Sequence, residues 1–327
     1  MHFTSRPAAA LIAALAIVSA ASHAAAQGSY PDRTVKILVG YPAGGPVDII
    51  ARVVGDKLAA QWGKPVVVEN IPGAAGNIAG DRTAHATPDG YILMMATNAT
   101  IAINPSLYAK MTYDPGKDLV PISEAVYSPN ILVVPNDLPV KSVAELVSYA
   151  RAHPGLTFAS AGVGTTQHLA GELFKAMAHI DIRHVPYRGA APVIPDLLAG
   201  RVNMYFGAIA PLIPLVREGK LHALAVTSPK RFPAAPDLPT MIEAGYPGFE
   251  SVLAMGLMAP KGTPPAVIEK IHQASVRGLS DADVRAKLNK IGMEIVNSSP
   301  KEFAAALDAE RPQWAKVIKE AGITPAH

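Results

Sequence analysis

The spacing of hydrophobic positions changes along residues 36–58, where an apolar run gives way to a glycine-rich stretch and then to a helical repeat. Residues 36–40 have the length and composition of a short buried strand. Apolar residues then recur every three or four positions, as in the buried stripe of a helix: Val47, Ile50, Val54 and Leu58. Three small residues fill the connection: Ala43, Gly44 and Gly45. Their backbone could approach an anion beside the unpaired first amides of the helix, although most such connections only join two elements.

A second unit of the same kind follows. Residues 66–68 are predicted to form a buried strand, and Gly73 and Gly76 mark the loop after it. Asn77 could cap a helix over residues 78–86, and residues 91–95 give the next strand. Successive right-handed crossovers would place both glycine-rich loops at the carboxyl edge of one parallel sheet, where α/β proteins bind ligands.

The second half of the chain repeats this pattern around residues 158–177. A short strand is followed by a loop rich in hydroxyl groups and small residues, and then by an amphipathic helix. The candidate binding positions in this loop are Ser160, Ala161, Gly164, Thr165 and Thr166. No lysine follows the last glycine, so the loop is not a phosphate-binding P-loop, and a carboxylate fits better. His168, in the first turn of the helix, is assigned a binding or structural role.

The remaining segments complete an α/β pattern. Residues 97–128 are irregular and lead into a strand that crosses to a second domain. Further strands are predicted at 182–186, 202–206, 221–226 and 252–258, the last returning to the first domain. Two sequences resemble capping boxes, Ser142 with Glu145 and Ser299 with Glu302. The second begins the last of three C-terminal helices, which Pro312 should kink.

Composition places the chain among globular proteins. It has 327 residues, of which 50% are hydrophobic and 17% charged, which is enough for two domains. The formal net charge of +3 is too small to indicate binding of nucleic acid. The sequence contains no cysteine, so it forms no disulfide and its leader cannot carry a lipid on cysteine.

The N-terminus has the pattern of an export signal. Arg6 precedes an apolar run over about 8–21, and small residues follow at 24–26. This predicts a signal peptide over residues 1–26, cleaved near Ala26. No later stretch reaches the about 18 apolar residues of a membrane span, so we expect a soluble exported protein with no span in its mature part.

Taken together, six segments resemble one known family. In order they are YPAGGPVDIIARVV, VENIPGAAGNIAG, TPDGYILMMAT, FASAGVGTTQHLAGELF, HVPYRGAAPVIPDLLAGRV and LMAPKGTPPAVIEKI. Over residues 30–327 the chain is similar to the Bug receptors, the extracytoplasmic solute-binding proteins of the tripartite tricarboxylate transporter (TctC) family. The resemblance implies an α/β, type II periplasmic-binding-protein fold with a ligand cleft between two lobes. It implies a first lobe over 27–129 and 252–327, and a second over 130–251.

The resemblance also implies how the protein works. A small carboxylated solute would be held by loop amides and hydroxyls, and the closed receptor would deliver it to the membrane permease subunits of the transporter. The protein would be a periplasmic monomer without catalytic residues, metal or cofactor. One lobe would contribute Ala43, Gly44, Gly45 and Asp48 with the turn containing Gly73, Gly76 and Asn77. The other would contribute Ser160, Ala161, Gly164, Thr165, Thr166 and His168, with Ala190 nearby.

Several points stay open in the sequence. Asp48 could orient its loop or accept a ligand amine, and the solute is not identified. Pro46 stands where the family usually has a residue with an amide, so one potential donor is missing. The alternatives are a secreted hydrolase or isomerase that uses Ser160, His168 and Asp48, and an orphan sensory receptor. The first lacks a G-x-S-x-G elbow and metal-spaced histidines.

Overall fold

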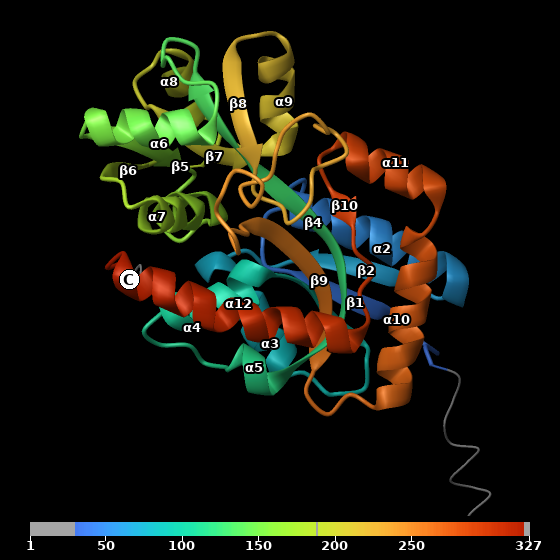
Figure 1. The fold of residues 1–327 in the computed structure, drawn as a ribbon. Coiled ribbons are helices and arrows are strands. Elements are labelled where there is room, and N and C mark those ends of the chain that lie inside the picture. Colours follow the sequence, from blue (N-terminus) through green and yellow to red (C-terminus); the bar gives the residue numbers. More distant parts are fainter. Residues whose placement is uncertain (1–29, 188, 324–327) are drawn as a thin grey trace, which may run out of the picture.

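The computed structural model describes residues 30–187 and 189–323, and the predicted signal peptide lies outside them. Within this part the strands form one path in the order β2-β1-β3-β9-β4-β7-β5-β6, with β8 and β10 paired to β4 (Figure 1). The strands are β1 (Val35–Val39), β2 (Val66–Asn70), β3 (Ile92–Thr97), β4 (Leu119–Pro135), β5 (Leu156–Ser160), β6 (Ile182–Pro186), β7 (Met204–Ala208), β8 (Leu221–Val226), β9 (Val252–Pro260) and β10 (Glu294–Ile295).

Helices cover both faces of this path. They are α2 (Pro46–Trp62), the 3₁₀ turn η1 (Ala74–Gly76), α3 (Asn77–Ala84), the π-helical turn η2 (Ala99–Ile103), α4 (Asn104–Leu107), α5 (Pro115–Asp118), α6 (Val143–Ala152), α7 (Thr166–Ala178), α8 (Val193–Leu198), α9 (Ile209–Arg217), α10 (Pro265–Leu279), α11 (Ala282–Lys290) and α12 (Pro300–Glu320). Among the described residues no helix combines the length and apolar character that a membrane crossing requires.

The first lobe is built on β1, which pairs in parallel with both β2 and β3. Alternate residues of β1 face two cores. Ile37 and Val39 pack with α2 and α10, whereas Leu38 packs with α3 and the first half of α12. Because β1 and β2 run in parallel, the loops that follow them emerge at the same edge, as the sequence predicts.

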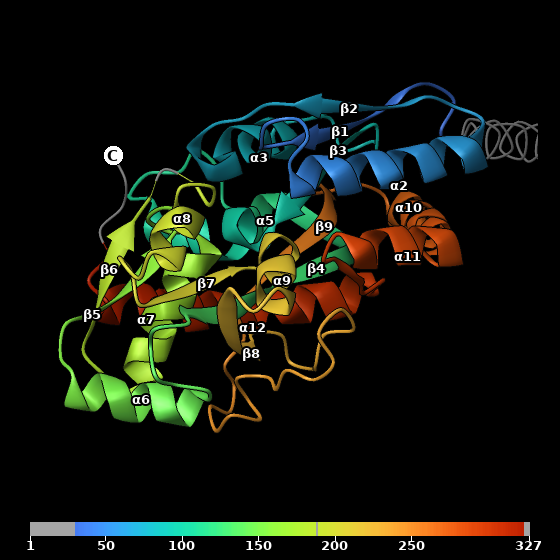
Figure 2. The same ribbon diagram turned by 90° about the horizontal axis from the view of Figure 1, so that it is seen from above.

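The second lobe repeats this layered arrangement around β5, which pairs in parallel with β6 and β7. Phe158 on β5 packs with α6 and α7, and its neighbour Ala159 packs with α8 and α9. Figure 2 shows β1–β3 and β5–β7 in separate lobes, with β4 and β9 between them. The predicted two-lobed α/β fold is therefore confirmed.

The two lobes share β4, a strand of 17 residues. It pairs with β9 from Leu119 to Pro129, and from Asn130 onward it pairs with β7 and β8. The sequence pattern predicts an irregular segment before residue 128, but β4 already begins at Leu119 and pairs with β9 there. Two register shifts against β9 break its two-residue alternation, so the first part of this strand lacks the sequence pattern of a regular strand.

The last helix, α12, contacts the cores of both lobes. Phe303 and Leu307 lie in the first-lobe core with Leu38, whereas Trp314 and Val317 lie in the second-lobe core. Figure 1 shows α12, in red, running from the β4–β9 pair toward α7. Its predicted capping box is present, and the helix continues through Pro312. The capping box predicted at Ser142 is incomplete. The Ser142 hydroxyl accepts from Glu145 N, but the Glu145 carboxylate accepts from Lys141 N and not from Ser142 N.

Candidate functional site

A pocket of about 290 Å³ lies where loops of the two lobes meet. Three of these loops follow the carboxyl ends of parallel strands: Tyr41 follows β1, Ala75 follows β2, and residues 161–165 follow β5. The full lining is Tyr41, Ala75, Ala99, Leu107, Tyr108, Ala161, Val163, Gly164, Thr165, Thr166, Gln167 and Leu253. α/β proteins bind ligands at this position, so we take the pocket as the candidate site.

The start of α7 supplies the polar end of the pocket. Thr165 is the N-cap of this helix, and its Oγ1 accepts from His168 N at 3.3 Å and donates to Gly162 O at 2.7 Å. Thr166 and Gln167 then occupy the first helical positions, whose amides have no acceptor inside a helix. These amides and the helix dipole favour a negatively charged group.

Ser160 and His168 hold this loop in shape. The Ser160 hydroxyl is fully buried, accepts from Gly162 N at 3.1 Å and lies 2.6 Å from His184 Nε2. His168 Nδ1 accepts from Gly164 N at 3.1 Å. Both side chains therefore bond to the loop or to its support, while Ala161, Gly164, Thr165 and Thr166 line the pocket.

The two imidazole rings form a buried stack. The centroids of His168 and His184 lie 3.8 Å apart, and Phe158 stacks on the same group. Burial, together with the neighbouring His184, lowers the pKa of His168 to about 3. Burial also lowers the pKa of His184 to about 4. Both rings are therefore neutral at pH 7 and can act as hydrogen-bond acceptors.

Asp48 orients the first-lobe loop. It is 3% exposed, and its Oδ2 accepts from Gly44 N at 2.8 Å. Oδ1 accepts from Asn70 Nδ2 at 2.9 Å, and Arg52 bonds to both oxygens. The hydrogen bond from Arg52, followed by those from Gly44 and Asn70, lowers the pKa of Asp48 to about 2 despite its burial. With both oxygens engaged, Asp48 fits the role of orienting the loop better than that of binding an amine.

The predicted first-lobe glycines shape the site without lining it. Ala43, Gly44 and Gly45 lie beside Tyr41, which does line the pocket. In the second turn the lining residue is Ala75, whose carbonyl accepts from Tyr41, Thr100 and Asn104. Gly73 and Gly76 flank it with positive φ values of 144° and 91°. The glycines thus permit the backbone turns, and their neighbours face the cleft.

Asn77 and Ala190 lie away from the pocket lining. Asn77 is not the N-cap of α3, because Gly76 holds that position. Its Oδ1 accepts from Asn104 Nδ2 at 2.7 Å, so the side chain ties α3 to α4. Ala190 O accepts from Val193 N at 3.2 Å, and the adjacent Gly189 donates to Ala161 O at 3.0 Å. The Ala190 loop therefore supports the cleft loop.

Sequence reasoning missed most of the apolar lining. Tyr41 could have been found because it directly follows the first strand, and Val163 because it interrupts a loop of small residues. Leu107 and Tyr108 fall in the segment that was predicted to be irregular, and Leu253 is one apolar residue among many in β9. Only their position in space identifies these three.

The arrangement does not favour the acid–base set Ser160, His168 and Asp48. Ser160 contacts His184 rather than His168. Asp48 belongs to the other lobe, where Gly44, Arg52 and Asn70 bind its oxygens. Among the described residues no group of three or more acidic or histidine side chains is arranged to hold a metal ion.

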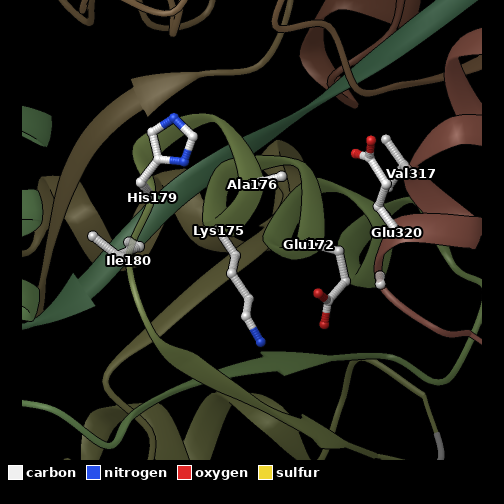
Figure 3. Close-up of a pocket in the computed structure, with 8 residues that line it drawn as sticks. Glu172, Lys175, Ala176, His179, Ile180, Val317 and Glu320 are labelled. Atoms are coloured by element: carbon white, nitrogen blue, oxygen red, sulfur yellow. The ribbon is translucent and has the colours of Figure 1, made fainter.

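A second hollow of about 290 Å³ lies between the C-terminal turns of α7 and α12 (Figure 3). Glu172, Lys175 and His179 line it from the α7 side, and Val317 and Glu320 line it from α12. It is not built from loops at strand ends. Glu172 lies 3.7 Å from His168 Nε2, which connects this hollow to the support of the cleft loop.

Comparisons with known proteins agree on one group. Residues 50–323 match the family described as "Tripartite tricarboxylate transporter family receptor" (TctC). The chain is 34% identical to Protein BugT of Bordetella pertussis, over 95% of this chain and 97% of BugT. It is also similar to the structure of R. palustris Rpa4515 with adipate, with 37% identity, 91% and 100% of the two chains covered, and a TM-score of 0.77. MatC (Rpa3494) from Rhodopseudomonas palustris with bound malate is 33% identical, with 88% and 100% covered and a TM-score of 0.72.

Proposed function

Since the chain belongs to the tripartite tricarboxylate transporter (TctC) receptor family, we propose that it is an extracytoplasmic receptor for a small carboxylated solute. It captures the solute between its lobes and delivers it to the permease subunits of a tripartite transporter. The observation that carries this function is the pocket between the lobes, which the first residues of α7 line together with loops of the other lobe. Two similar proteins have structures with carboxylates, Rpa4515 with adipate and MatC with bound malate.

The carboxylate sits at the start of α7. The amides of Thr166 and Gln167 and the Thr166 hydroxyl are its donors, and the helix dipole adds to their attraction. Ala161, Gly164 and Thr165 shape this end of the cleft. Ser160 and His168 position this loop by accepting hydrogen bonds from its amides, as Asp48 does in the first lobe.

Closure follows from ligand contact with both lobes. A ligand that touches the α7 loop and also Tyr41 or Ala75 stabilises the closed form more than the open one. The movement takes place about β4 and β9, where β4 changes partners after Pro129. This divides the chain into a first lobe of residues 27–129 and 252–327 and a second lobe of 130–251.

Export and partners complete the proposal. The segment 1–26 directs the chain to the periplasm. There the receptor acts as a monomer, and the permease recognises its closed form. The family is one of receptors, and we propose that this chain catalyses no reaction. Without permease subunits, the same binding event would serve a sensory role.

A thermal-shift screen tests the function. The full chain is expressed with its own leader, recovered from the periplasm, and its mass is measured to locate cleavage. We expect one or more small carboxylic acids to raise the melting temperature, because a ligand at 100 times its Kd stabilises the folded state by about 2.7 kcal/mol.

A matched variant makes the screen specific. Thr166→Val removes the hydroxyl at the start of α7 and should abolish most of the shift. Thr112→Val, outside the cleft lining, should retain it. A shift with neutral sugars or amines, and with no acid, would contradict the proposed function.

A further inference from the structure

The body of the candidate pocket is lined by hydrocarbon from both lobes. Leu107 and Tyr108 come from the end of α4, Leu253 comes from the start of β9, and Val163 comes from the second-lobe loop. Alanine side chains at 75, 99 and 161 fill the spaces between them. The described residues of this lining carry no charged side chain. Such a surface contacts an apolar ligand body well.

Val163 is the clearest sign that this surface has a ligand. It is a large aliphatic side chain in a loop of glycine and hydroxyl residues, and it is 50% exposed. It lies in the pocket lining beside Gly164. An isolated exposed valine needs no explanation, but one that shares a concave surface with Leu107 and Leu253 extends an apolar patch across the cleft.

Two hydroxyl groups at the edge of this patch, those of Tyr41 and Thr165, are already engaged. Tyr41 Oη contacts Thr97 Oγ1 at 2.9 Å and Ala75 O at 3.2 Å. Thr165 Oγ1 is engaged by Gly162 O and His168 N. A hydroxyl on the ligand body that lies beside these two groups would therefore lose water and find few partners, whereas a methylene group would gain apolar contact.

Leu107 makes the patch continuous between the lobes. It is 4% exposed, and a Cβ placed on Gly164 would lie 2.4 Å from its Cδ2. The side chain of a first-lobe helix therefore packs directly on the backbone of the second-lobe loop. A hydrocarbon ligand body in the pocket would lie beside this contact and extend it.

We propose that the cleft selects carboxylates with an unsubstituted alkyl or aromatic body over hydroxylated acids of the same length. Val163, Leu107, Tyr108 and Leu253 are the residues that determine this specificity. The inference rests on the proposed carboxylate function and adds the ligand class. It assigns the polar end of the ligand to α7 and its body to the apolar patch.

Length-matched acids test the inference by calorimetry. Adipate and galactarate share a six-carbon chain and two carboxylates, but galactarate carries four hydroxyl groups. Succinate and tartrate form a second pair that differs by two. We expect the unsubstituted acid of a pair to bind at least tenfold more tightly, and phenylacetate to bind more tightly than mandelate.

One conservative variant adds a local readout. Val163→Thr keeps the side-chain shape and adds a hydroxyl at an exposed site, so the protein should fold, and the preference within a pair should fall several-fold. Val67→Thr is the control, because Val67 is 46% exposed on β2 and outside the pocket. An unchanged preference in Val163→Thr would remove Val163 from the specificity set.

The outcomes separate the two proposals. If galactarate, tartrate or mandelate binds as tightly as its unsubstituted partner, the inference is wrong and the carboxylate receptor stands. If no acid of any pair binds to folded protein free of carried-over ligand, both are overturned.

Discussion

The backbone N–H of Gly164 donates a hydrogen bond to Nδ1 of His168 at 3.1 Å. The same relation occurs in the other lobe, where Gly44 donates to Oδ2 of Asp48 at 2.8 Å. In each case the donor is a loop glycine and the acceptor is a buried side chain four residues later, in the first turn of a helix. Each lobe thus fixes its loop with a hydrogen bond from a glycine N–H. The acceptor is an imidazole nitrogen in the second lobe and a carboxylate oxygen in the first.

Removal of the acceptor at position 168 should loosen the second-lobe loop. His168→Leu leaves the Gly164 N–H without a partner, which should lower the free energy of unfolding by about 1–3 kcal/mol and weaken acid binding. His168→Asn places an amide oxygen near the position of Nδ1 and should restore part of both. Urea unfolding measures the change in stability, and calorimetry measures the change in acid binding. Equal losses in the two variants would show that ring packing, not the hydrogen bond, matters.

Asp48→Asn distinguishes loop orientation from amine binding. The variant weakens the contacts to Gly44 and Arg52, and should destabilise the fold by about 1–3 kcal/mol. Because the loop is disturbed for every ligand, the affinities for succinate and aspartate should fall by the same factor. A loss confined to aspartate would instead place Asp48 against the ligand amine. Calorimetry with both acids decides between the two roles.

Stability should fall with acid because both buried histidines resist protonation, and His184 offers the test. Burial lowers its folded-state pKa to about 4, below the unfolded value of about 6.5, so its contribution is fully present above pH 6.5 and is lost as the pH falls toward 4. Between pH 7 and pH 5 the loss should be on the order of 1–2 kcal/mol. His184→Gln keeps a polar partner for Ser160 but does not titrate, so in urea unfolding it should lack this part of the loss, while the part from His168 remains. A variant with the same acid dependence as the parent would contradict the assignment.

Glu310 should have the opposite effect on the pH dependence of stability, because it stabilises the fold as the pH falls. Burial raises its pKa to about 7, above its ordinary value, so the folded state takes up a proton and gains stability as the pH falls from 8 toward 4.5. Glu310→Gln keeps an acceptor for Asn98 Nδ2 and removes the charge. The variant should be more stable than the parent by about 1–3 kcal/mol at pH 8, and the difference should shrink by pH 5.

Glu320→Gln controls for loss of a carboxylate from the same helix at an exposed position. Urea midpoints at pH 8 and pH 5 give both differences. A Glu310→Gln variant that is less stable than the parent at pH 8 would show that the charge is stabilising.

Gly164→Ala should separate backbone strain from contact between the lobes. Gly164 has φ of +78°, and an added Cβ would meet Leu107. Gly219→Ala is the matched control, because φ is +69° and nothing lies within 4 Å of the added atom. Both variants should lose about 1 kcal/mol from the backbone, but only Gly164→Ala should also lose ligand affinity. Similar stability and intact binding in both variants would show that Leu107 does not pack against Gly164.

The glycine loops were predictable because the change from a strand to a helical period marks them in the sequence. Which residue of each loop faces the cleft was not, since Tyr41 and Ala75 differ from the glycines beside them only in where the backbone turns them. The role of Asp48 depends on Asn70, which reaches it only through the pairing of β1 with β2. Likewise Ser160 meets His184 because β5 and β6 pair in a particular register, with Phe158 opposite His184.

The position of β9 also determines how the molecule is assembled. Met94 of β3 pairs with Met258 of β9, and Val120 of β4 pairs with Ala259, so a late strand lies between two early ones. The sheet of the first lobe is incomplete until β9 has joined it, and the segment that contains β5 to β8 precedes β9 in the chain. Contacts between such distant positions slow folding. The cleft, which needs both lobes, should therefore be among the last parts of the protein to form.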